Sequence, residues 1–89
     1  MSDNLKIVVY SLENCPNCEL LKSFLKQNGF EYQELDLADP ANMTELRLNN
    51  VFVREAPVLQ VEDKFLVSAD LFSGGAVITD NVLPLCKGE

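Results

Sequence analysis

The sequence predicts an α/β domain built on a mixed four-stranded sheet with helices on both faces. Three observations lead to this prediction: an apolar strand at residues 6–10, two helix starts marked by a cap residue followed by proline, and two short apolar segments joined by a polar turn. The resulting order is strand–helix–strand–helix, then strand–strand–helix, which buries apolar stripes on both faces of a sheet. We expect one domain over residues 1–89, because a chain of this length has room for only one core.

The first half of the chain predicts a strand–helix–strand unit. Residues 6–10 are β-branched and almost continuously apolar, as is typical of a strand buried on both faces, and the small and polar residues 11–14 end it. Cys15-Pro16 then opens a helix with proline at its first position, and Asn28-Gly29 ends that helix. Residues 32–37 alternate in polarity and predict the next strand.

The second half predicts a helix, a hairpin and a less regular end. Asp39-Pro40 repeats the start signal of a cap followed by proline, and the helix should end near Asn49-Asn50. Residues 58–61 and 65–67 flank a polar turn and predict an antiparallel hairpin. A short helical turn at 70–72, an interruption at Gly74-Gly75 and a final helix within 77–86, weakened by Pro84, complete the chain. This order of elements is that of the thioredoxin fold.

The composition excludes several classes of function. With a net charge of -7 and only 7 basic residues, the chain lacks the clustered cations that nucleic-acid binding requires. The absence of histidine excludes Ser-His-Asp and Cys-His catalysis as well as His-ligated metal sites. Residues 1–6 do not show the basic and then apolar pattern of an export signal, so we expect none, and no apolar stretch reaches the roughly 20 residues that span a bilayer. Three cysteines, an odd number, favour a reducing compartment, so we expect a cytoplasmic monomer without membrane contact.

Cys15-Pro16-Asn17-Cys18 has the spacing of a redox dithiol, and it stands directly after a buried strand at a predicted helix start. The unpaired amides and the dipole of a helix start favour negative charge, so Cys15 is the predicted nucleophile. Cys18, three residues further on, would resolve the mixed disulfide. The alternatives are inert cysteines or half of a zinc or iron–sulfur site bridging two chains through Cys15. A zinc or iron–sulfur site needs four ligands, and Cys86 is the only further thiol in the sequence, so we predict no bound metal. The simplest role of Cys86 is that of a small buried apolar residue.

Ala56-Pro57, just before the predicted strand at residue 58, is the second candidate element. A proline at the first residue of a strand is ordinary and alone says little. If the peptide bond is cis, the backbone of Ala56 turns toward the Cys15 sulfur and keeps its polar groups free. An extended substrate could then pair there as an added strand.

Together, Ile-Val-Val-Tyr-Ser, Cys-Pro-Asn-Cys and residues 36–40 and 54–58 resemble the glutaredoxin family over about residues 6–70. Glutaredoxins have a thioredoxin fold and a catalytic Cys-Pro-x-Cys motif, and they reduce disulfides or glutathione adducts. The resemblance implies that Cys15 and Cys18 form the catalytic pair, that Pro57 is the cis-proline, and that no cofactor is bound. It also implies glutathione as a co-substrate.

Several positions around the motif depart from the family pattern. Glu13 replaces a basic residue, Asn17 a tyrosine and Glu55 a threonine, whereas Asp70 matches an aspartate that in the family holds the γ-glutamyl end of glutathione. Asp70 is also consistent with a cap of the short helix, and Glu13 and Glu19 with solvated acids that complement the helix dipole. The predicted substrate-binding residues are Glu13, Pro16, Asn17, Glu55, Ala56, Pro57 and Asp70.

Acidic residues near the thiols should oppose thiolate formation and repel the two carboxylates of glutathione. We therefore predict an electron donor that reduces protein disulfides with weak or no dependence on glutathione. Its own donor would be thioredoxin reductase or a similar system. The alternative within the family is a glutathione-dependent reductase.

Overall fold

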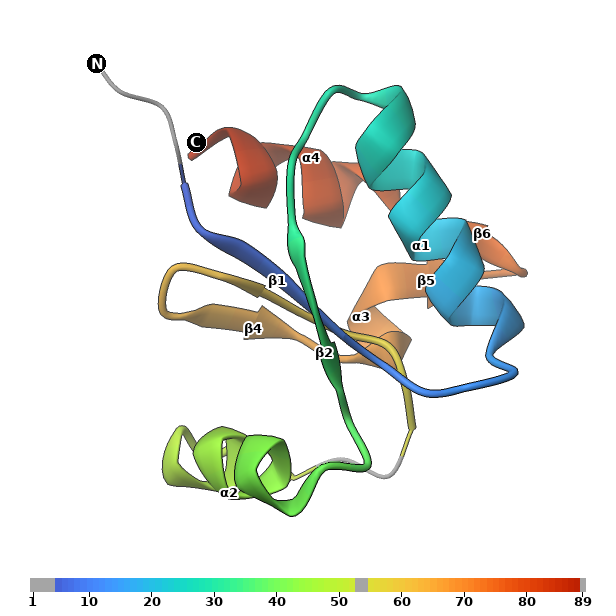
Figure 1. Ribbon diagram of the computed structural model, residues 1–89. Helices are drawn as coiled ribbons and strands as arrows, with labels where there is room; N and C mark the ends of the chain where they lie inside the picture. Colours follow the sequence, from blue (N-terminus) through green and yellow to red (C-terminus); the bar gives the residue numbers. More distant parts are fainter. Residues whose placement is uncertain (1–4, 53–54, 89) are drawn as a thin grey trace.

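The computed structural model describes residues 5–52 and 55–88 (Figure 1). Its centre is a four-stranded sheet in the order β2-β1-β3-β4. β1 (Ile7–Ser11) runs parallel to β2 (Gln33–Asp36) and antiparallel to β3 (Val58–Val61). β3 in turn pairs antiparallel with β4 (Lys64–Leu66). This is the mixed sheet that the sequence predicts.

β1 lies in the centre of the sheet because it must be covered on both faces. All five of its residues are buried, and the run of Ile7, Val8 and Val9 favours a pleated, densely packed strand. The strand extends one residue beyond the predicted end. Ser11 continues the parallel pairing opposite Asp36, so a hydroxyl that suggested a loop belongs to the strand.

Two helices cover one face of the sheet. α1 (Pro16–Gln27) turns Leu21 and Leu25 onto it, and α4 (Thr79–Lys87) contributes Val82 and Cys86. The sheet itself adds Ile7, Val9, Leu59 and Val61 to this core. α1 begins and ends as predicted, with Cys15 as its N-cap and Asn28 as its C-cap.

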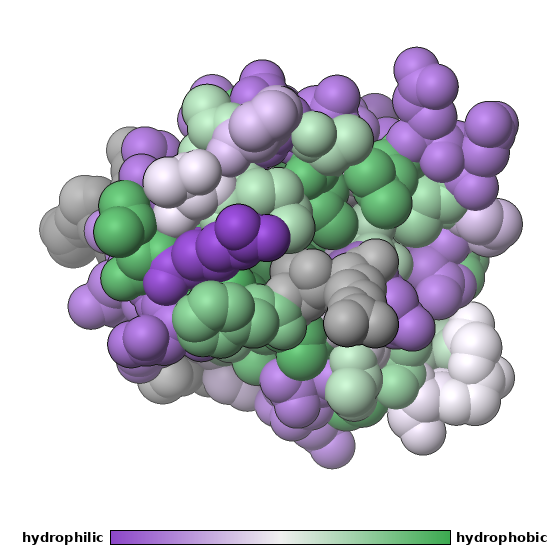
Figure 2. All heavy atoms as spheres, turned by 90° about the horizontal axis from the view of Figure 1, so that it is seen from below, coloured by the Kyte–Doolittle hydropathy of each residue, from purple (hydrophilic) through white to green (hydrophobic). Residues whose placement is uncertain are grey.

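α2 (Pro40–Leu48) covers the opposite face, where fully buried Leu46 packs with Val8, Tyr10, Leu37 and Val58. Asp39 caps the helix as predicted, because its carboxylate accepts the Ala41 N–H at 2.9 Å. Asn50, predicted near the end of the helix, lies beyond it in the left-handed region with φ 64°. Leu48 and Phe52 are exposed, and Figure 2, which views the molecule from the side of α2, shows hydrophobic and hydrophilic residues intermixed on that face.

The segment after β4 differs most from the prediction. The predicted helical turn at 70–72 is α3 (Ser68–Leu71), and Gly74-Gly75 is a hairpin turn rather than a helix interruption. That hairpin joins β5 (Phe72–Ser73) to β6 (Ala76–Val77), and β6 contacts α1. The two glycines have φ values of 60° and 81°, the positive pair that a two-residue hairpin turn requires.

α4 continues through Pro84, which was expected to weaken it. The proline removes one intrahelical hydrogen bond, but Val82 and Cys86 bury the helix in the core, and tertiary packing outweighs propensity here. In the described ranges 5–52 and 55–88, no helix combines the length and the apolar character needed to cross a membrane.

Candidate active site

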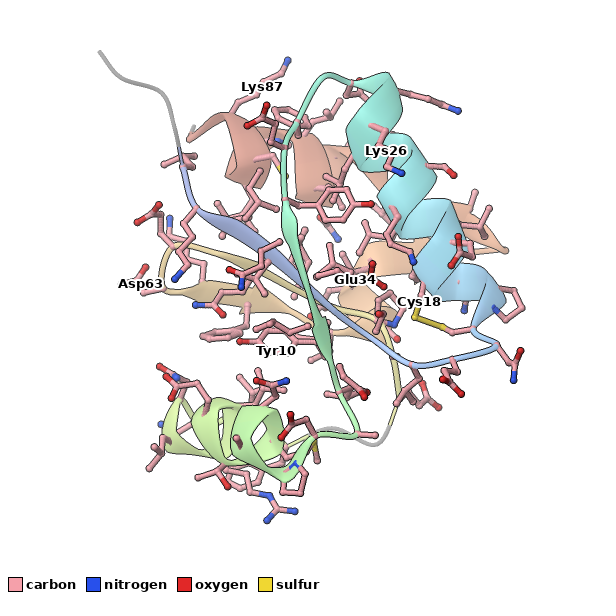
Figure 3. The ribbon with its side chains drawn as sticks, in the orientation of Figure 1. Tyr10, Cys18, Lys26, Glu34, Asp63 and Lys87 are labelled. Carbon is pink, nitrogen blue, oxygen red and sulfur yellow. A yellow bond between two sulfur atoms is a disulfide. The ribbon has the colours of Figure 1, made fainter. Side chains whose placement is uncertain are left out.

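The disulfide between Cys15 and Cys18 closes the first turn of α1, with the two Cα atoms 5.2 Å apart (Figure 3). Cys15 is the N-cap, and the backbone N–H of Cys18 donates to its Sγ at 3.1 Å. Pro16 stands at the first helical position, where an N–H would have no intrahelical partner. A helix start that directs an N–H at sulfur stabilises a thiolate more than a thiol, which favours Cys15 as the nucleophile.

The two sulfur-bearing residues differ in accessibility. Cys15 is half-buried, whereas Cys18 is only 1% exposed against the core. An incoming substrate can therefore reach Cys15, while Cys18 can attack only a bond already formed there. This arrangement fits the predicted roles of nucleophile and resolving thiol.

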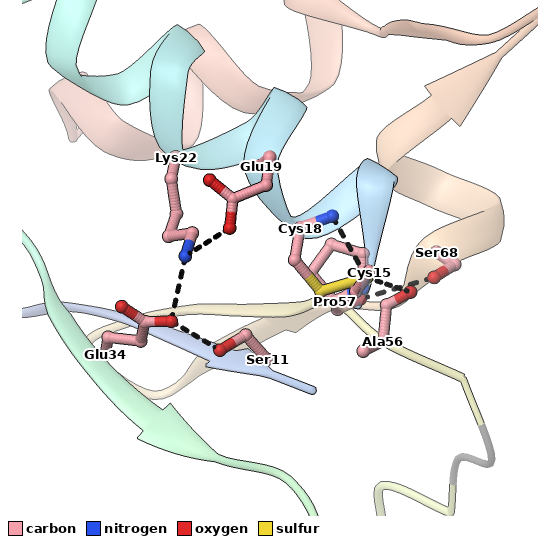
Figure 4. The surroundings of a disulfide bond; sticks show 9 residues. All are labelled: Ser11, Cys15, Cys18, Glu19, Lys22, Glu34, Ala56, Pro57 and Ser68. Atoms are coloured by element: carbon pink, nitrogen blue, oxygen red, sulfur yellow. Dashed lines mark hydrogen bonds and ion pairs between the residues drawn. A yellow bond between two sulfur atoms is a disulfide. The ribbon is translucent and has the colours of Figure 1, made fainter. Parts of the chain in front are cut away.

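The segment before β3 faces the disulfide (Figure 4). The Ala56–Pro57 peptide bond is cis, and Pro57 is fully buried. The Ala56 carbonyl oxygen lies 3.9 Å from Cys15 Sγ, a contact rather than a hydrogen bond, because a disulfide sulfur carries no proton. Ser68 Oγ donates to the Pro57 carbonyl at 3.3 Å and ties the start of α3 to this segment. The structure thus brings Ala56 and Cys15 together as predicted.

The remaining predicted substrate-binding residues are exposed, and the sequence or the elements place them as follows. Glu13 stands two residues before Cys15, Pro16 and Asn17 lie between the two cysteines, and Glu55 directly precedes Ala56. Asp70 lies on α3 and its side chain is also exposed. Its alternative role as a helix cap is wrong, because the N-cap of α3 is Val67 and no side chain caps this turn.

A polar network near the disulfide is not predicted by the sequence (Figure 4). Ser11 Oγ donates to Glu34 Oε2 at 2.6 Å, and Lys22 Nζ donates to the same oxygen at 3.0 Å. Lys22 also pairs with Glu19 at 2.9 Å, three residues earlier on α1. The spacing of Glu19 and Lys22 is a helix-pair signal in the sequence, but their meeting with Glu34 depends on how α1 lies over the sheet.

The hydrogen bonds in this network shift two ionisation equilibria. The hydroxyl of Ser11 and then the ammonium of Lys22 hold the pKa of Glu34 below its ordinary value. Glu19 and then Glu34 raise the pKa of Lys22. Both groups therefore stay charged at neutral pH.

Cys86 lies on α4 and is 4% exposed. Burial raises the pKa of its thiol to about 11, because a low-dielectric environment disfavours the charged thiolate. Within residues 5–52 and 55–88, no group of three or more Cys, Asp or Glu residues is arranged to hold a metal ion.

These environments predict selective alkylation of the reduced protein. At about pH 8, iodoacetamide should modify Cys15 at least about 100-fold faster than Cys86, because the buried thiol with its raised pKa supplies little thiolate. Mass spectrometry of peptides from the folded protein measures both rates. The same reaction in denaturant is the control, where the difference should largely disappear. Comparable rates in the folded protein would contradict the assigned environments.

The comparisons with known proteins agree with this geometry. The family model Glutaredoxin matches residues 7–66. N-acetyl-S-hydroxy-L-cysteine reductase of Bacillus subtilis (strain 168) is 33% identical over 61 residues. That match covers 68% of this chain and 66% of the relative, just under two thirds of the relative's length.

Two solved structures share the fold. The thioredoxin-like protein BC3987 superposes with a TM-score of 0.60 at 28% identity over 71% of this chain and 86% of that one. The glutaredoxin-like protein NrdH-redoxin of Escherichia coli gives a TM-score of 0.57 at 21% identity over 70% and 80%. The predicted thioredoxin fold is confirmed by these neighbours. Because the family model covers the β1–α1 segment with its Cys15–Cys18 pair and continues through β4, the chain belongs to the glutaredoxin family.

Proposed function

We propose that this protein acts as a cytoplasmic monomer that reduces disulfides in protein partners and is itself reduced by thioredoxin reductase or a comparable donor. One observation carries the proposal: a disulfide at the start of α1 pairs an accessible sulfur, Cys15, with a buried one, Cys18. That asymmetry separates attack on the substrate from resolution of the intermediate.

The reaction has two exchange steps. The Cys15 thiolate attacks one sulfur of the substrate disulfide, so a mixed disulfide forms and the other substrate sulfur leaves as a thiolate that takes up a proton. Cys18 then attacks the Cys15 sulfur, forms the Cys15–Cys18 bond and releases the second substrate thiol. The substrate gains two electrons and two protons. The donor returns two electrons to the bridge, together with one proton for Cys18, because Cys15 returns to its thiolate form.

The backbone at Ala56 is the proposed docking point for the substrate. Its carbonyl lies 3.9 Å from Cys15 Sγ, and an extended segment that carries the target disulfide would pair with this backbone as an added strand. The exposed side chains of Glu13, Asn17 and Glu55 border the approach, and Pro16 lies beside Cys15.

The charge around the bridge supports a donor other than glutathione. A surface pocket of about 390 Å³, bounded on one side by the residues 11–14 that lead into Cys15, is lined by four carboxylates, those of Glu13, Glu19, Glu34 and Asp36. Lys22 is the one cation among the described residues that line this pocket. Glutathione carries two carboxylates, and like charges brought together oppose its binding.

Donor dependence tests this proposal. We expect insulin reduction with thioredoxin reductase to exceed that with glutathione and glutathione reductase by about tenfold or more, the factor that about 1.4 kcal/mol of repulsion produces. Glu13→Lys, which supplies the basic residue of the family pattern, should increase the glutathione-coupled rate selectively. Glu31→Lys makes the same charge change at an exposed position in the α1–β2 loop and should leave that rate unchanged. A wild-type rate that is highest with glutathione would contradict the proposed donor.

The relative in Bacillus subtilis favours a second candidate function, the reduction of small S-hydroxycysteine derivatives. Here Cys15 would attack the sulfur of the S–OH group, the oxygen would leave as water after protonation, and Cys18 would release the cysteine thiol. The products are one thiol, one water and the Cys15–Cys18 bridge. Competition between insulin and N-acetyl-S-hydroxycysteine in one assay distinguishes the two functions, since the preferred substrate inhibits turnover of the other.

A further inference from the structure

The charge of Lys22 is the feature beside the bridge that the proposed reaction does not use. Lys22 follows Cys18 by four residues on α1, so the two side chains lie on successive turns of one helix face. Its side chain is 16% exposed, and Figure 4 shows its ammonium directed toward Glu34 on β2. A cation at this position would stabilise a thiolate at the start of the helix.

Two carboxylates hold that cation. Lys22 Nζ lies 2.9 Å from Glu19 Oε2 and 3.0 Å from Glu34 Oε2. Glu34 is fixed in turn by the Ser11 hydroxyl at 2.6 Å, and Ser11 is a buried residue at the end of β1. The group of Lys22, Glu19 and Glu34 therefore carries one net negative charge where an unpaired lysine would carry one positive charge.

We propose that Glu19 and Glu34 neutralise Lys22 and thereby keep the reduction potential of the Cys15–Cys18 pair low. Glu34 is a positioning residue, because it acts on the cysteines through Lys22. The proposal rests on the proposed function of the bridge as the redox group.

The physical reason is that only the reduced state carries charge at the cysteines. Reduction adds two electrons to the S–S bond and, when Cys15 is a thiolate and Cys18 a thiol, one proton. The oxidised bridge is neutral, so a nearby charge changes the free energy of the reduced state alone. Neighbouring negative charge raises that free energy and makes the protein a stronger reductant.

The test is the reduction potential of matched variants, measured by equilibration with dithiothreitol at about pH 8 and low salt, where charge effects are largest. Glu34→Gln should raise the equilibrium constant for reduction of the bridge about threefold, or about 14 mV by the two-electron constant. Lys22→Met should lower it by about the same factor. Glu19→Gln is a second variant, on the exposed side of the network. It should raise the equilibrium constant for reduction of the bridge, as Glu34→Gln does.

Two remote substitutions serve as controls. Asp63→Asn in the turn between β3 and β4, and Lys87→Met at the end of α4, make the same changes of charge far from the bridge (Figure 3). Both should leave the potential at the wild-type value. About 1 M salt should reduce the shifts of the network variants, because screening weakens interactions between partly exposed charges.

The double variant Lys22→Met/Glu34→Gln separates charge from loss of packing. It removes one charge of each sign, so its potential should return close to that of the wild type. A general loosening of α1 would instead move both single variants in the same direction and the double variant furthest, which overturns the proposal. Unchanged potentials in the single variants overturn it as well. A wild-type bridge that does not exchange with dithiothreitol at all would overturn the proposed function together with this one.

Discussion

Cys15→Ser is expected to lower the rate of disulfide reduction by about 1,000-fold or more, as is usual when a catalytic nucleophile is removed. Serine cannot form the mixed disulfide, and Cys18 cannot replace it because only 1% of that residue is exposed. The measurement is insulin reduction with thioredoxin reductase and dithiothreitol as separate donors. Retention of more than about a tenth of the wild-type rate would contradict the assigned nucleophile.

Cys18→Ser and Cys86→Ser are the matched controls for this loss. With Cys18 absent, Cys15 still attacks, so intact-mass spectrometry should detect a mixed disulfide with the substrate that the wild type resolves. Cys86→Ser should leave the rate unchanged, because this residue lies on α4 in the core and contributes no atom to the reaction. A lack of adduct in Cys18→Ser would show that the two cysteines do not act in the proposed order.

Leu21→Ala should have the largest effect on stability, a loss of about 3 kcal/mol in the free energy of unfolding. Leu21 is 0% exposed and packs in the core between α1 and the sheet, so truncation leaves a cavity. Small domains have only about 5–15 kcal/mol of stability in total, so this is a large fraction. Urea unfolding of the oxidised protein measures it through the midpoint.

Leu20→Ala is the control for this prediction. It removes the same atoms from the neighbouring position of α1, where the side chain is 44% exposed, and should cost less than about 1 kcal/mol. Equal costs at positions 20 and 21 would show that helix propensity rather than burial dominates.

The sequence predicts correctly those features that residues next to one another in the chain determine. Asp39-Pro40 caps α2 as predicted, and Cys15-Pro16 opens α1, because both signals depend only on the backbone at a helix start. The dithiol spacing identified the bridge for the same reason. The family resemblance stated from these segments is confirmed by the family match over residues 7–66.

Features that depend on how helices and strands pack against one another could not be predicted from the sequence. The Ser11–Glu34–Lys22 contact requires the register in which Ser11 lies opposite Asp36, together with the position of α1 over the sheet. The sequence predicts a break in a helix at Gly74-Gly75, whereas in the structure these two glycines form the two-residue turn between β5 and β6. Pro84 does not interrupt α4 as its missing N–H predicts, because burial of the helix through Val82 and Cys86 compensates for the lost hydrogen bond.

The bridge links residues only three positions apart within a single helical turn. A cross-link limits the freedom of the unfolded chain according to the length of the loop that it closes, and so short a loop limits it less than a long one would. The scaffold should therefore persist almost unaltered whether the sulfurs are joined or separate. A partner protein then meets nearly the same surface before and after electron transfer, and its departure is driven by cleavage of the intermolecular S–S bond rather than by a change of shape.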